Sequence, residues 1–434
     1  MQTRKFSSQL SVALTAIAMA TLVTATCAAA QTEKVLYSFA YGSQPGAYPS
    51  SGLIFDAGNL YGATDFAGSN GSGAAFELTR QADGDWIGKS LYSFSPDNFG
   101  EFPVGLVFGA SGHLYGVTLN GGTLNCAIGD EGLSCGTVFE LTKMCGHWTG
   151  KILHDFDRNG KDGFFPEAGV IVDAAGNLYG TTGQGGAYGG GTYTGGTVFK
   201  LTPKSGGWTE TILHNFGNDK DGQIPEGLTF DAAGNLYGIT FEGGAYGLGT
   251  AFELTPNSGG WTETILHSFG SGKDGSFPPL AQPQELSITG SLILDDKGNL
   301  YGTTASGGDY GGGTVFELMP AVDGTWTETV LHSFNGIDGS GPLAGVIVDA
   351  KGNLYGTTTS GGDYGGGTAF KLMPAEDGTW TETVLHSFND NGTDGWEPLA
   401  GLTFDASGNL YGTTYQGGTG NCYEGCGTAF EITP

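Results

Sequence analysis

Short runs of β-branched and aromatic residues, separated by turn residues, follow one another along the chain. One full set reads Leu343–Asp349, Leu354–Thr358, Thr368–Leu372 and Trp380–Phe388. Runs of this length, bounded by Gly, Pro, Asn or Asp, are typical of β-strands. No helical period interrupts them, so the set predicts four antiparallel strands.

This four-strand unit repeats. The segment Gly-Asn-Leu-Tyr-Gly, or a close variant, recurs with its Leu at positions 60, 114, 178, 236, 300, 354 and 410. Four-stranded units repeated in this way are the signature of blades arranged around a central axis. The pattern predicts seven blades.

The two ends of the repeat region complement each other. Lys34–Phe39 copies a fourth strand without the first three, and Gly427–Pro434 ends on a third strand without a fourth. Together they complete one blade, and a closed ring leaves no sheet edge free to pair with another chain. We therefore expect an all-β, seven-bladed β-propeller of four-stranded antiparallel blades, closed by the N-terminal strand completing the last blade, and a monomer.

The recurring blocks Leu-His-Ser-Phe, Gly-Asn-Leu-Tyr-Gly-Thr-Thr and Gly-Gly-Thr-Val-Phe-Glu-Leu resemble the Gloeo/Verruco (GloVer) tandem repeat of bacterial extracellular proteins. The resemblance covers residues 34–434. It implies export and tandem β repeats, often beside a separate surface anchor, and it supplies no catalytic residues.

The first 30 residues read as a cleaved signal peptide. Arg4 and Lys5 precede an apolar stretch from Leu10 to Thr26, and Ala28–Ala30 form a small-residue cleavage site. Cys27 raises the alternative of lipidation, but Thr24 stands where such a signal normally has Leu or Val. We expect residues 31–434 to form a single propeller domain that is secreted, extracellular or periplasmic, and no transmembrane segment.

The chain is strongly acidic. Its 16 Lys and Arg stand against 44 Asp and Glu, a net charge of −28, and loss of Arg4 and Lys5 would make it 14 − 44 = −30. Nucleic acid and anionic lipid need Lys and Arg to neutralise phosphate, so neither is an expected partner. The acidity favours solubility outside the cell and leaves divalent cations open.

Calcium is the cofactor that remains open. The loops Asp157–Gly163, Asp219–Gly222 and Asn389–Gly395 are rich in Asp, Asn and Gly, whose oxygens suit calcium. Their spacing does not match the helix-loop-helix calcium pattern and lacks its distal Glu. Ordinary turn chemistry explains them more simply, and no metal-binding residue is predicted.

Most repeated polar residues have structural interpretations. The Asp of the Asp-x-x-Gly-Asn turns can bond forward to backbone amides, so we interpret these acids as turn formers: Asp56, Asp173, Asp231, Asp295, Asp349 and Asp405. Five histidines share one repeat position, where two blades have Tyr37 and Tyr92, which favours hydrogen-bonded packing over a metal or a general base. They are His154, His214, His267, His332 and His386.

Five cysteines follow the predicted cleavage site. Cys126 and Cys135, and likewise Cys422 and Cys426, flank the same loop in blades two and seven, which predicts two loop-closing disulfides in an exported protein. Cys145 has no matching partner, so we expect a free thiol or a crosslink to another molecule.

The variable loops are where function is expected. The loops from fourth to first strand and from second to third strand should share one face, and they hold nearly all the length variation. Trp396, with Tyr188, Tyr246, Tyr310 and Tyr364, could present aromatic faces to a ligand there. The bland alternative is that these rings pack on their own loops.

These observations favour a binding or interaction module for an extracellular glycan or protein. The alternative is a carbohydrate-active hydrolase or lyase using acids such as Asp309, Asp363 and Asp394, which would require them to converge in one pocket. A structural cell-envelope protein is a third reading. No G-x-S-x-G or H-E-x-x-H motif appears, so no catalytic residue is predicted.

Overall fold

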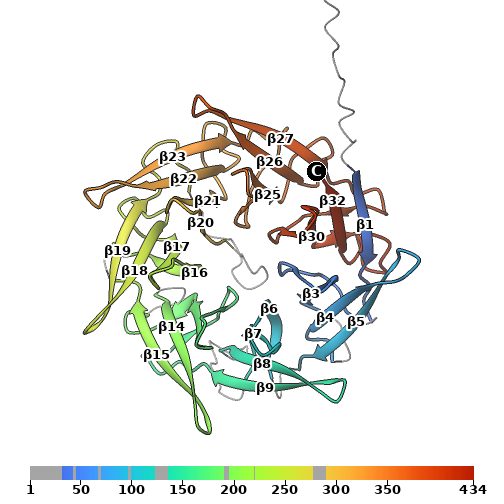
Figure 1. Ribbon diagram of the computed structural model, residues 1–434, viewed down its shortest axis with the longest axis horizontal. Coiled ribbons are helices and arrows are strands. Elements are labelled where there is room, and N and C mark those ends of the chain that lie inside the picture. The colour runs from blue at the N-terminus through green and yellow to red at the C-terminus, as the bar shows by residue number, and fades with distance from the viewer. Residues whose placement is uncertain are drawn as a thin grey trace, which may run out of the picture.

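A computed structural model shows seven four-stranded sheets arranged radially around a central axis (Figure 1). It describes residues 32–42, 45–66, 70–95, 99–122, 135–189, 195–218, 220–276 and 290–434. These residues form strands, turns and loops without helices, so none offers a helix long and apolar enough to cross a membrane. The all-β, seven-bladed propeller predicted from the repeats is confirmed.

Blades one to three follow the chain from the axis outward. Their strands are β2 (Ile54–Asp56), β3 (Asn59–Thr64), β4 (Ala74–Arg80) and β5 (Trp86–Ser93); β6 (Glu101–Phe108), β7 (Leu114–Asn120), β8 (Thr137–Met144) and β9 (His147–Asp155); and β11 (Ile171–Val172), β12 (Leu178–Thr182), β14 (Thr197–Lys204) and β15 (Gly207–Asn215).

Blades four to six repeat this order. Their strands are β16 (Gln223–Phe230), β17 (Leu236–Glu242), β18 (Thr250–Asn257) and β19 (Gly260–Ser268); β20 (Ile293–Leu294), β21 (Leu300–Thr304), β22 (Thr314–Pro320) and β23 (Trp326–Ser333); and β24 (Ile347–Val348), β25 (Leu354–Thr358), β26 (Thr368–Pro374) and β27 (Trp380–Ser387).

The seventh blade joins both ends of the ring. It contains β29 (Thr403–Phe404), β30 (Leu410–Thr414), β32 (Thr428–Thr433) and, outermost, β1 (Thr32–Ser38). β1 pairs antiparallel with β32, from Thr32 opposite Thr433 to Ser38 opposite Thr428. The predicted closure by the N-terminal strand is therefore present, and Figure 1 shows the blue and red strands side by side.

The core lies between the blades. At every interface a Phe at the end of one fourth strand meets a Phe in the next third strand; Phe156 and Phe199, for example, are fully buried with ring centroids 5.2 Å apart. The Gly of each Asn-Leu-Tyr-Gly segment makes room for this ring, since a Cβ on Gly180 would lie 2.6 Å from Cζ of Phe199. The repeat is thus a packing unit shared by two blades.

A left-handed residue stands just before the proline that leads into several first strands. Phe165 has φ 56°, and Tyr48, Phe102, Ile224 and Glu397 have similar values. The Phe165 N–H donates to the carbonyl of Cys135 in the preceding blade at 2.9 Å. This strained conformation ties neighbouring blades together at their inner ends.

Candidate functional site

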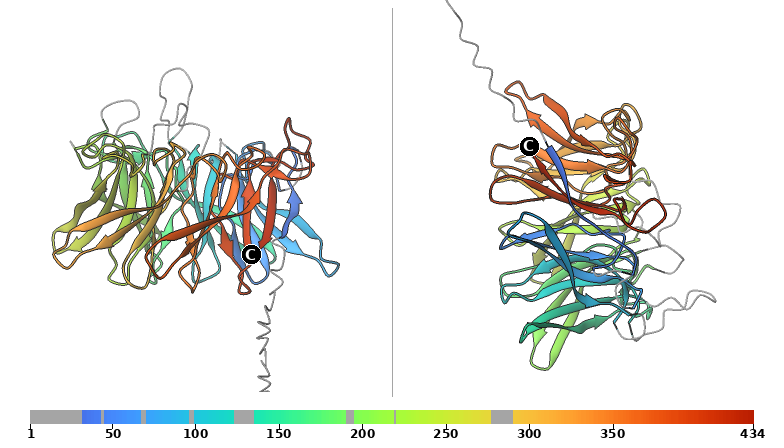
Figure 2. Two further views of the ribbon diagram at one scale, coloured as in Figure 1. Left: turned by 90° about the horizontal axis from the view of Figure 1, so that it is seen from above. Right: turned by 90° about the vertical axis from the view of Figure 1, so that its right-hand side faces the viewer.

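Two kinds of loop share one face of the ring, as expected. The strip β10 (Gly163–Phe164) pairs with β13 (Gln184–Gly185), and β28 (Gly395–Trp396) pairs with β31 (Gln416–Gly417). Each strip joins a fourth-to-first strand loop to a second-to-third strand loop, and Figure 2 shows the ring edge-on. We call the face that carries these loops the loop face.

Four tyrosines of the loop face are exposed at one repeat position in consecutive blades. Tyr188, Tyr246, Tyr310 and Tyr364 are 49%, 56%, 68% and 64% exposed. We call them the tyrosine crown. The position is Asn70 in blade one and Gly420 in blade seven, so the crown covers one side of the ring.

Each crown loop is held to the strand beside it. The N–H of Asp309 donates to Oγ of Ser333, and that of Asp363 donates to Oγ of Ser387, both at 3.3 Å. Blades three and four have the same bond, from Ala187 to Asn215 and from Ala245 to Ser268. The tyrosines are therefore carried on anchored loops rather than on free tips.

A groove of about 440 Å³ opens beside Tyr310. It is lined by Lys273, Asp309, Tyr310, Val330, Leu331, His332, Ser333 and Asn335. Lys273 forms an ion pair with Asp309 across its rim. The groove thus combines an exposed aromatic ring, a charged pair and hydrogen-bonding side chains, the mixture found at recognition sites.

The other predicted ligand residues lie elsewhere. Trp396 is half-buried and packs on a cluster that includes Phe388 and Phe430, and its indole Nε1 has no hydrogen-bond partner in the described part of the chain. Asp394 is buried and contacts His386. The structure therefore does not bring Asp394 and Trp396 into the groove beside Asp309 and Tyr310, and Asp363 is exposed on the next blade.

All five repeated histidines bond to an aspartate of the loop that follows. The Nε2–Oδ2 distances run from 2.9 Å for His267 and Asp274 to 3.3 Å for His214 and Asp221. Each imidazole also packs against the Phe two residues later, as His154 does on Phe156 at 4.8 Å. Hydrogen-bonded packing, as inferred for these histidines, is what the contacts show.

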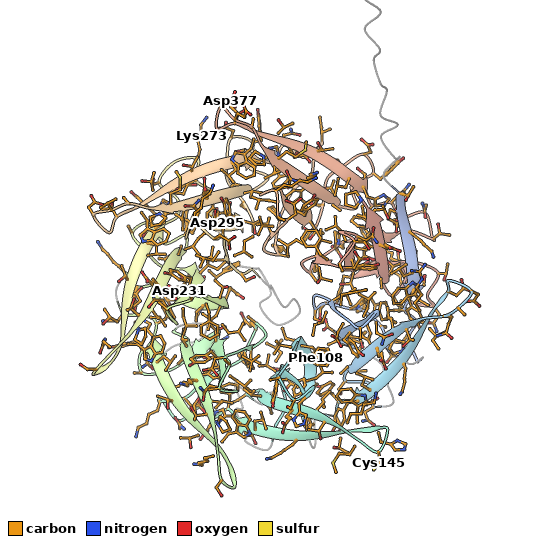
Figure 3. All side chains as sticks on the ribbon, in the orientation of Figure 1. Phe108, Cys145, Asp231, Lys273, Asp295 and Asp377 are labelled. Carbon is orange, nitrogen blue, oxygen red and sulfur yellow. A yellow bond between two sulfur atoms is a disulfide. The ribbon has the colours of Figure 1, made fainter. Side chains whose placement is uncertain are left out.

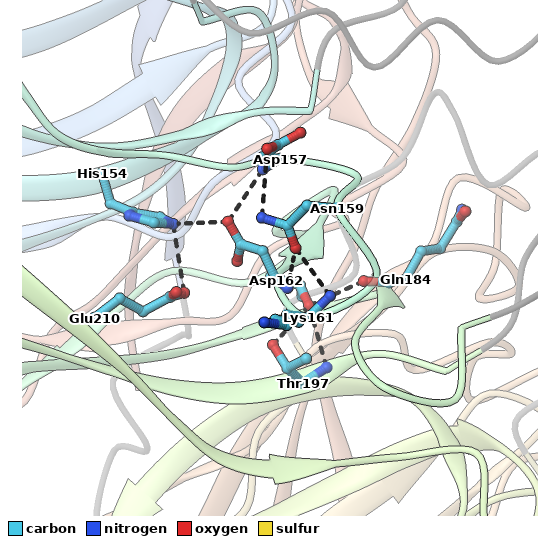
Figure 4. A network of polar contacts seen from close by, with 9 residues as sticks. His154, Asp157, Asn159, Lys161, Asp162, Gln184, Thr197 and Glu210 are labelled. Carbon is cyan, nitrogen blue, oxygen red and sulfur yellow. Dashed lines mark hydrogen bonds and ion pairs between the residues drawn. The ribbon is translucent and has the colours of Figure 1, made fainter.

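Sequence reasoning missed the third member of these contacts. Oε1 of Glu210, on the fourth strand of the next blade, lies 3.4 Å from Nε2 of His154, and Asp162 bonds to the same nitrogen at 3.1 Å (Figure 4). The hint was in the repeats, because this Glu is Gly in the two blades that follow Tyr37 and Tyr92.

Three buried carboxyl groups lie at the inner ends of blades one, three and four. Burial raises the pKa of Asp65 to about 7, although a hydrogen bond from Ser50 lowers it in part, and burial raises the pKa of Glu167 to about 8. Burial and the neighbouring Glu167 raise the pKa of Glu226 well above its usual value. Unlike the turn acids, these groups are not repeated in every blade.

The opposite face has a groove of about 830 Å³ near the axis. Its lining includes Asp231, Asp295, Asp296, Lys297 and Ile347, and Figure 3 labels Asp231 and Asp295 on the inner side of the ring. Asp231 and Asp295 are engaged in their own turns, each accepting bonds from two backbone amides. They are turn formers, as predicted.

One expected disulfide is fully described. Cys422 and Cys426 are joined, with Cα atoms 5.2 Å apart. Cys135 is also disulfide-bonded, while Cys126, its expected partner, lies outside the described residues. Cys145 is an exposed free thiol at the outer end of a hairpin (Figure 3).

The fold and the repeated loop face define a tandem-repeat β-propeller. The chain belongs to the Gloeobacter/Verrucomicrobia repeat family, whose model matches residues 18–193, 129–285 and 287–434. No curated protein matches it.

Solved structures with related folds are distant. A putative oxidoreductase (glucose dehydrogenase) from Thermus thermophilus is 15% identical, with 93% of this chain and 100% of that chain covered and a TM-score of 0.42. A putative 6-phosphogluconolactonase from Bacteroides uniformis is 15% identical, with 83% and 89% covered and a TM-score of 0.48. With TM-scores below 0.5, neither likeness carries weight for function.

Proposed function

We propose that this protein is an exported binding module whose tyrosine crown contacts an extracellular glycan. The observation that carries the proposal is the exposure of four tyrosines at one position in four consecutive blades. Tyrosine offers a large, stiff, amphipathic contact surface at low entropic cost, because it has few rotatable bonds. Such rings can stack on the apolar faces of sugars while their hydroxyl groups reach sugar hydroxyls.

The charge of the protein narrows the glycan. With 44 acidic residues against 16 basic ones, the surface repels anionic polymers. In the groove beside Tyr310, Lys273 is engaged by Asp309. A neutral glycan that crosses neighbouring blades is therefore the ligand favoured here, and a protein partner is the alternative.

The placement of the acids gives the hydrolase or lyase alternative no support. Such enzymes need two carboxyl groups a few ångströms apart around one bond. Asp309 forms an ion pair with Lys273, Asp394 is buried against His386, and Asp363 is exposed on the next blade. Turnover of any bound glycan remains to be measured.

The test is a glycan array with the mature chain, residues 31–434, with and without calcium. For any neutral glycan that binds, Tyr310→Ala should weaken the dissociation constant about tenfold, the usual effect of removing one anchoring aromatic ring. The combined variant Tyr246→Ala, Tyr310→Ala and Tyr364→Ala should abolish binding.

Tyr423→Ala is the matched control, because Tyr423 is 88% exposed but lies outside the crown position. It should leave the affinity unchanged. Binding that survives the triple variant would contradict the crown as the contact surface, and silence on every glycan would favour a protein partner or a structural role in the cell envelope.

A further inference from the structure

Seven blade interfaces contain one three-residue position near the outer edge of the ring. The first residue ends a fourth strand, the second precedes a Gly in the following loop, and the third lies on the fourth strand of the next blade. Five interfaces carry His, Asp and Glu: His154–Asp162–Glu210, His214–Asp221–Glu263, His267–Asp274–Glu328, His332–Asp338–Glu382 and His386–Asp394–Glu33.

The remaining two interfaces replace all three residues together. They carry Tyr37–Pro45–Gly88 and Tyr92–Phe99–Gly150. A Cβ on Gly150 would lie 2.6 Å from the Phe99 ring and 2.9 Å from the Tyr92 ring, so the rings fill the space that a Glu would need. Apolar residues can therefore close this interface, and packing alone does not require the polar set.

Two of the five polar sets are compact. In His154–Asp162–Glu210 and in His386–Asp394–Glu33, one nitrogen and two carboxylate oxygens lie within 4.8 Å of one another. In the first set, Asp162 and Glu210 approach the same His154 nitrogen, Nε2, at 3.1 and 3.4 Å. Three donor atoms thus face one point between two blades (Figure 4).

The first set leaves acceptor capacity unused. Asp162 is 6% exposed, and its second oxygen, Oδ1, is buried without a hydrogen-bond partner among the described residues. Within the same part of the chain, Oε1 of Glu33 in the second set is also buried without one. Buried carboxylate oxygens without donors are costly unless a proton or a cation balances them.

The acid–base properties agree with a shortage of positive charge. Burial raises the pKa of Glu210 to about 7; the neighbouring His154 lowers it in part, and Asp162 raises it further. Burial and Asp394 raise the pKa of Glu33 to about 7, against the opposing effect of His386. A divalent cation would supply the missing charge.

We propose that His154–Asp162–Glu210 and His386–Asp394–Glu33 each bind a divalent first-row transition metal ion, for which Zn²⁺ is the probe. One imidazole nitrogen and two carboxylate oxygens suit Zn²⁺, and water can complete a tetrahedral shell. Because the ligands come from two blades, the ion acts as a clasp across the interface. This inference is independent of the proposed glycan binding.

The experiment measures metal content in the full mature chain. After removal of metal, incubation with Zn²⁺ and gel filtration, elemental analysis should find about two Zn²⁺ per chain. Co²⁺ in place of Zn²⁺ should give visible absorption bands of a low-symmetry site. Zn²⁺ should also raise the melting temperature, because it binds only the folded chain.

Two variants of the first set provide the test. Glu210→Gln keeps the size of the side chain and should leave about one Zn²⁺ per chain. A triple variant, His154→Tyr, Asp162→Phe and Glu210→Gly, copies the Tyr92–Phe99–Gly150 interface and should have the same effect. Far-ultraviolet circular dichroism identifies any variant that does not fold.

Glu263→Gln is the matched control, because Glu263 occupies the same position in a set that is not compact. It should retain both ions. Wild-type protein that retains no Zn²⁺ after gel filtration would overturn the proposal, as would a folded Glu210→Gln chain that still binds both ions.

Discussion

At the residue scale, the repeated histidines show how far a pattern in the sequence can be interpreted. Their alternation with Tyr37 and Tyr92 correctly indicated hydrogen-bonded packing. The sequence could not place Glu210 beside His154, because that contact joins the outer strands of two blades 56 residues apart and depends on how closely the blades approach.

Trp396 illustrates the opposite difficulty. A tryptophan in an acidic loop suggests an exposed ring, but the short strip β28–β31 turns it onto the cluster around Phe388. Loop conformation decides such cases, and composition does not encode it.

Asp65 gives a prediction on pH. Burial raises its pKa from 3.8 to about 7, so between these values the unfolded chain is ionised at this site while the folded chain still holds a proton. Stability contributed by the neutral group is therefore full below about pH 4 and is lost as the pH rises toward 7. Asp65→Asn should remove on the order of 2 kcal/mol of the fall in unfolding free energy between pH 5 and pH 8.

Urea denaturation at the two pH values measures this difference. Asp405→Asn is the control, because hydrogen bonds from its turn outweigh burial and lower the pKa of Asp405, so its pH effect belongs below pH 4. An Asp65→Asn chain with the wild-type slope would contradict the assignment.

At the element scale, the turns were the most predictable part of the molecule. Asp349 accepts bonds from the N–H groups of Lys351 and Asn353 at 2.8 and 2.9 Å, and from the side chain of Asn353 at 2.7 Å. A short side chain that bonds forward is a local property, and local properties can be inferred from sequence. The left-handed Phe165 was not predicted, because its conformation is imposed by the preceding blade.

Asp349→Ala should therefore destabilise the sixth blade. It leaves several backbone and side-chain donors without their acceptor, at a cost of about 1–3 kcal/mol in the free energy of unfolding. Chemical denaturation followed by tryptophan fluorescence measures it.

Asp56→Ala is the comparison, because blade one reverses over Ala57 and Gly58, both left-handed with φ 49° and 84°. A two-residue turn of this kind relies on its backbone, so the change should cost less than about 0.5 kcal/mol. Equal losses for the two variants would show that the Asp349 bonds contribute nothing of their own.

At the scale of the whole molecule, the ring was predictable because its closure is written in two complementary ends. The count of seven blades followed from the repeats, and the pairing of β1 with β32 followed from a strand missing at each end. The face that binds a ligand could be chosen from loop variation, but the crown became visible only when four exposed tyrosines were placed on consecutive blades.

Deleting residues 31–38 should open the ring. β32 would then present unpaired backbone groups, and an exposed strand edge invites pairing between chains. We expect oligomers or aggregates in size-exclusion chromatography and a lower melting temperature, both reversed by adding a peptide with the β1 sequence. A deletion variant that stays monomeric with an unchanged melting temperature would show that β1 is dispensable for closure.

The pairing of β1 with β32 also determines how the ring responds to force. Because Thr32 lies opposite Thr433, the two free ends leave the seam at the same end. Tension between them would load the hydrogen bonds one after another, as in a zipper, rather than all at once. A molecule pulled by both ends would therefore yield first at its seam and at low force, whereas a pull applied through any two other blades would have to shear sheets that share their cores.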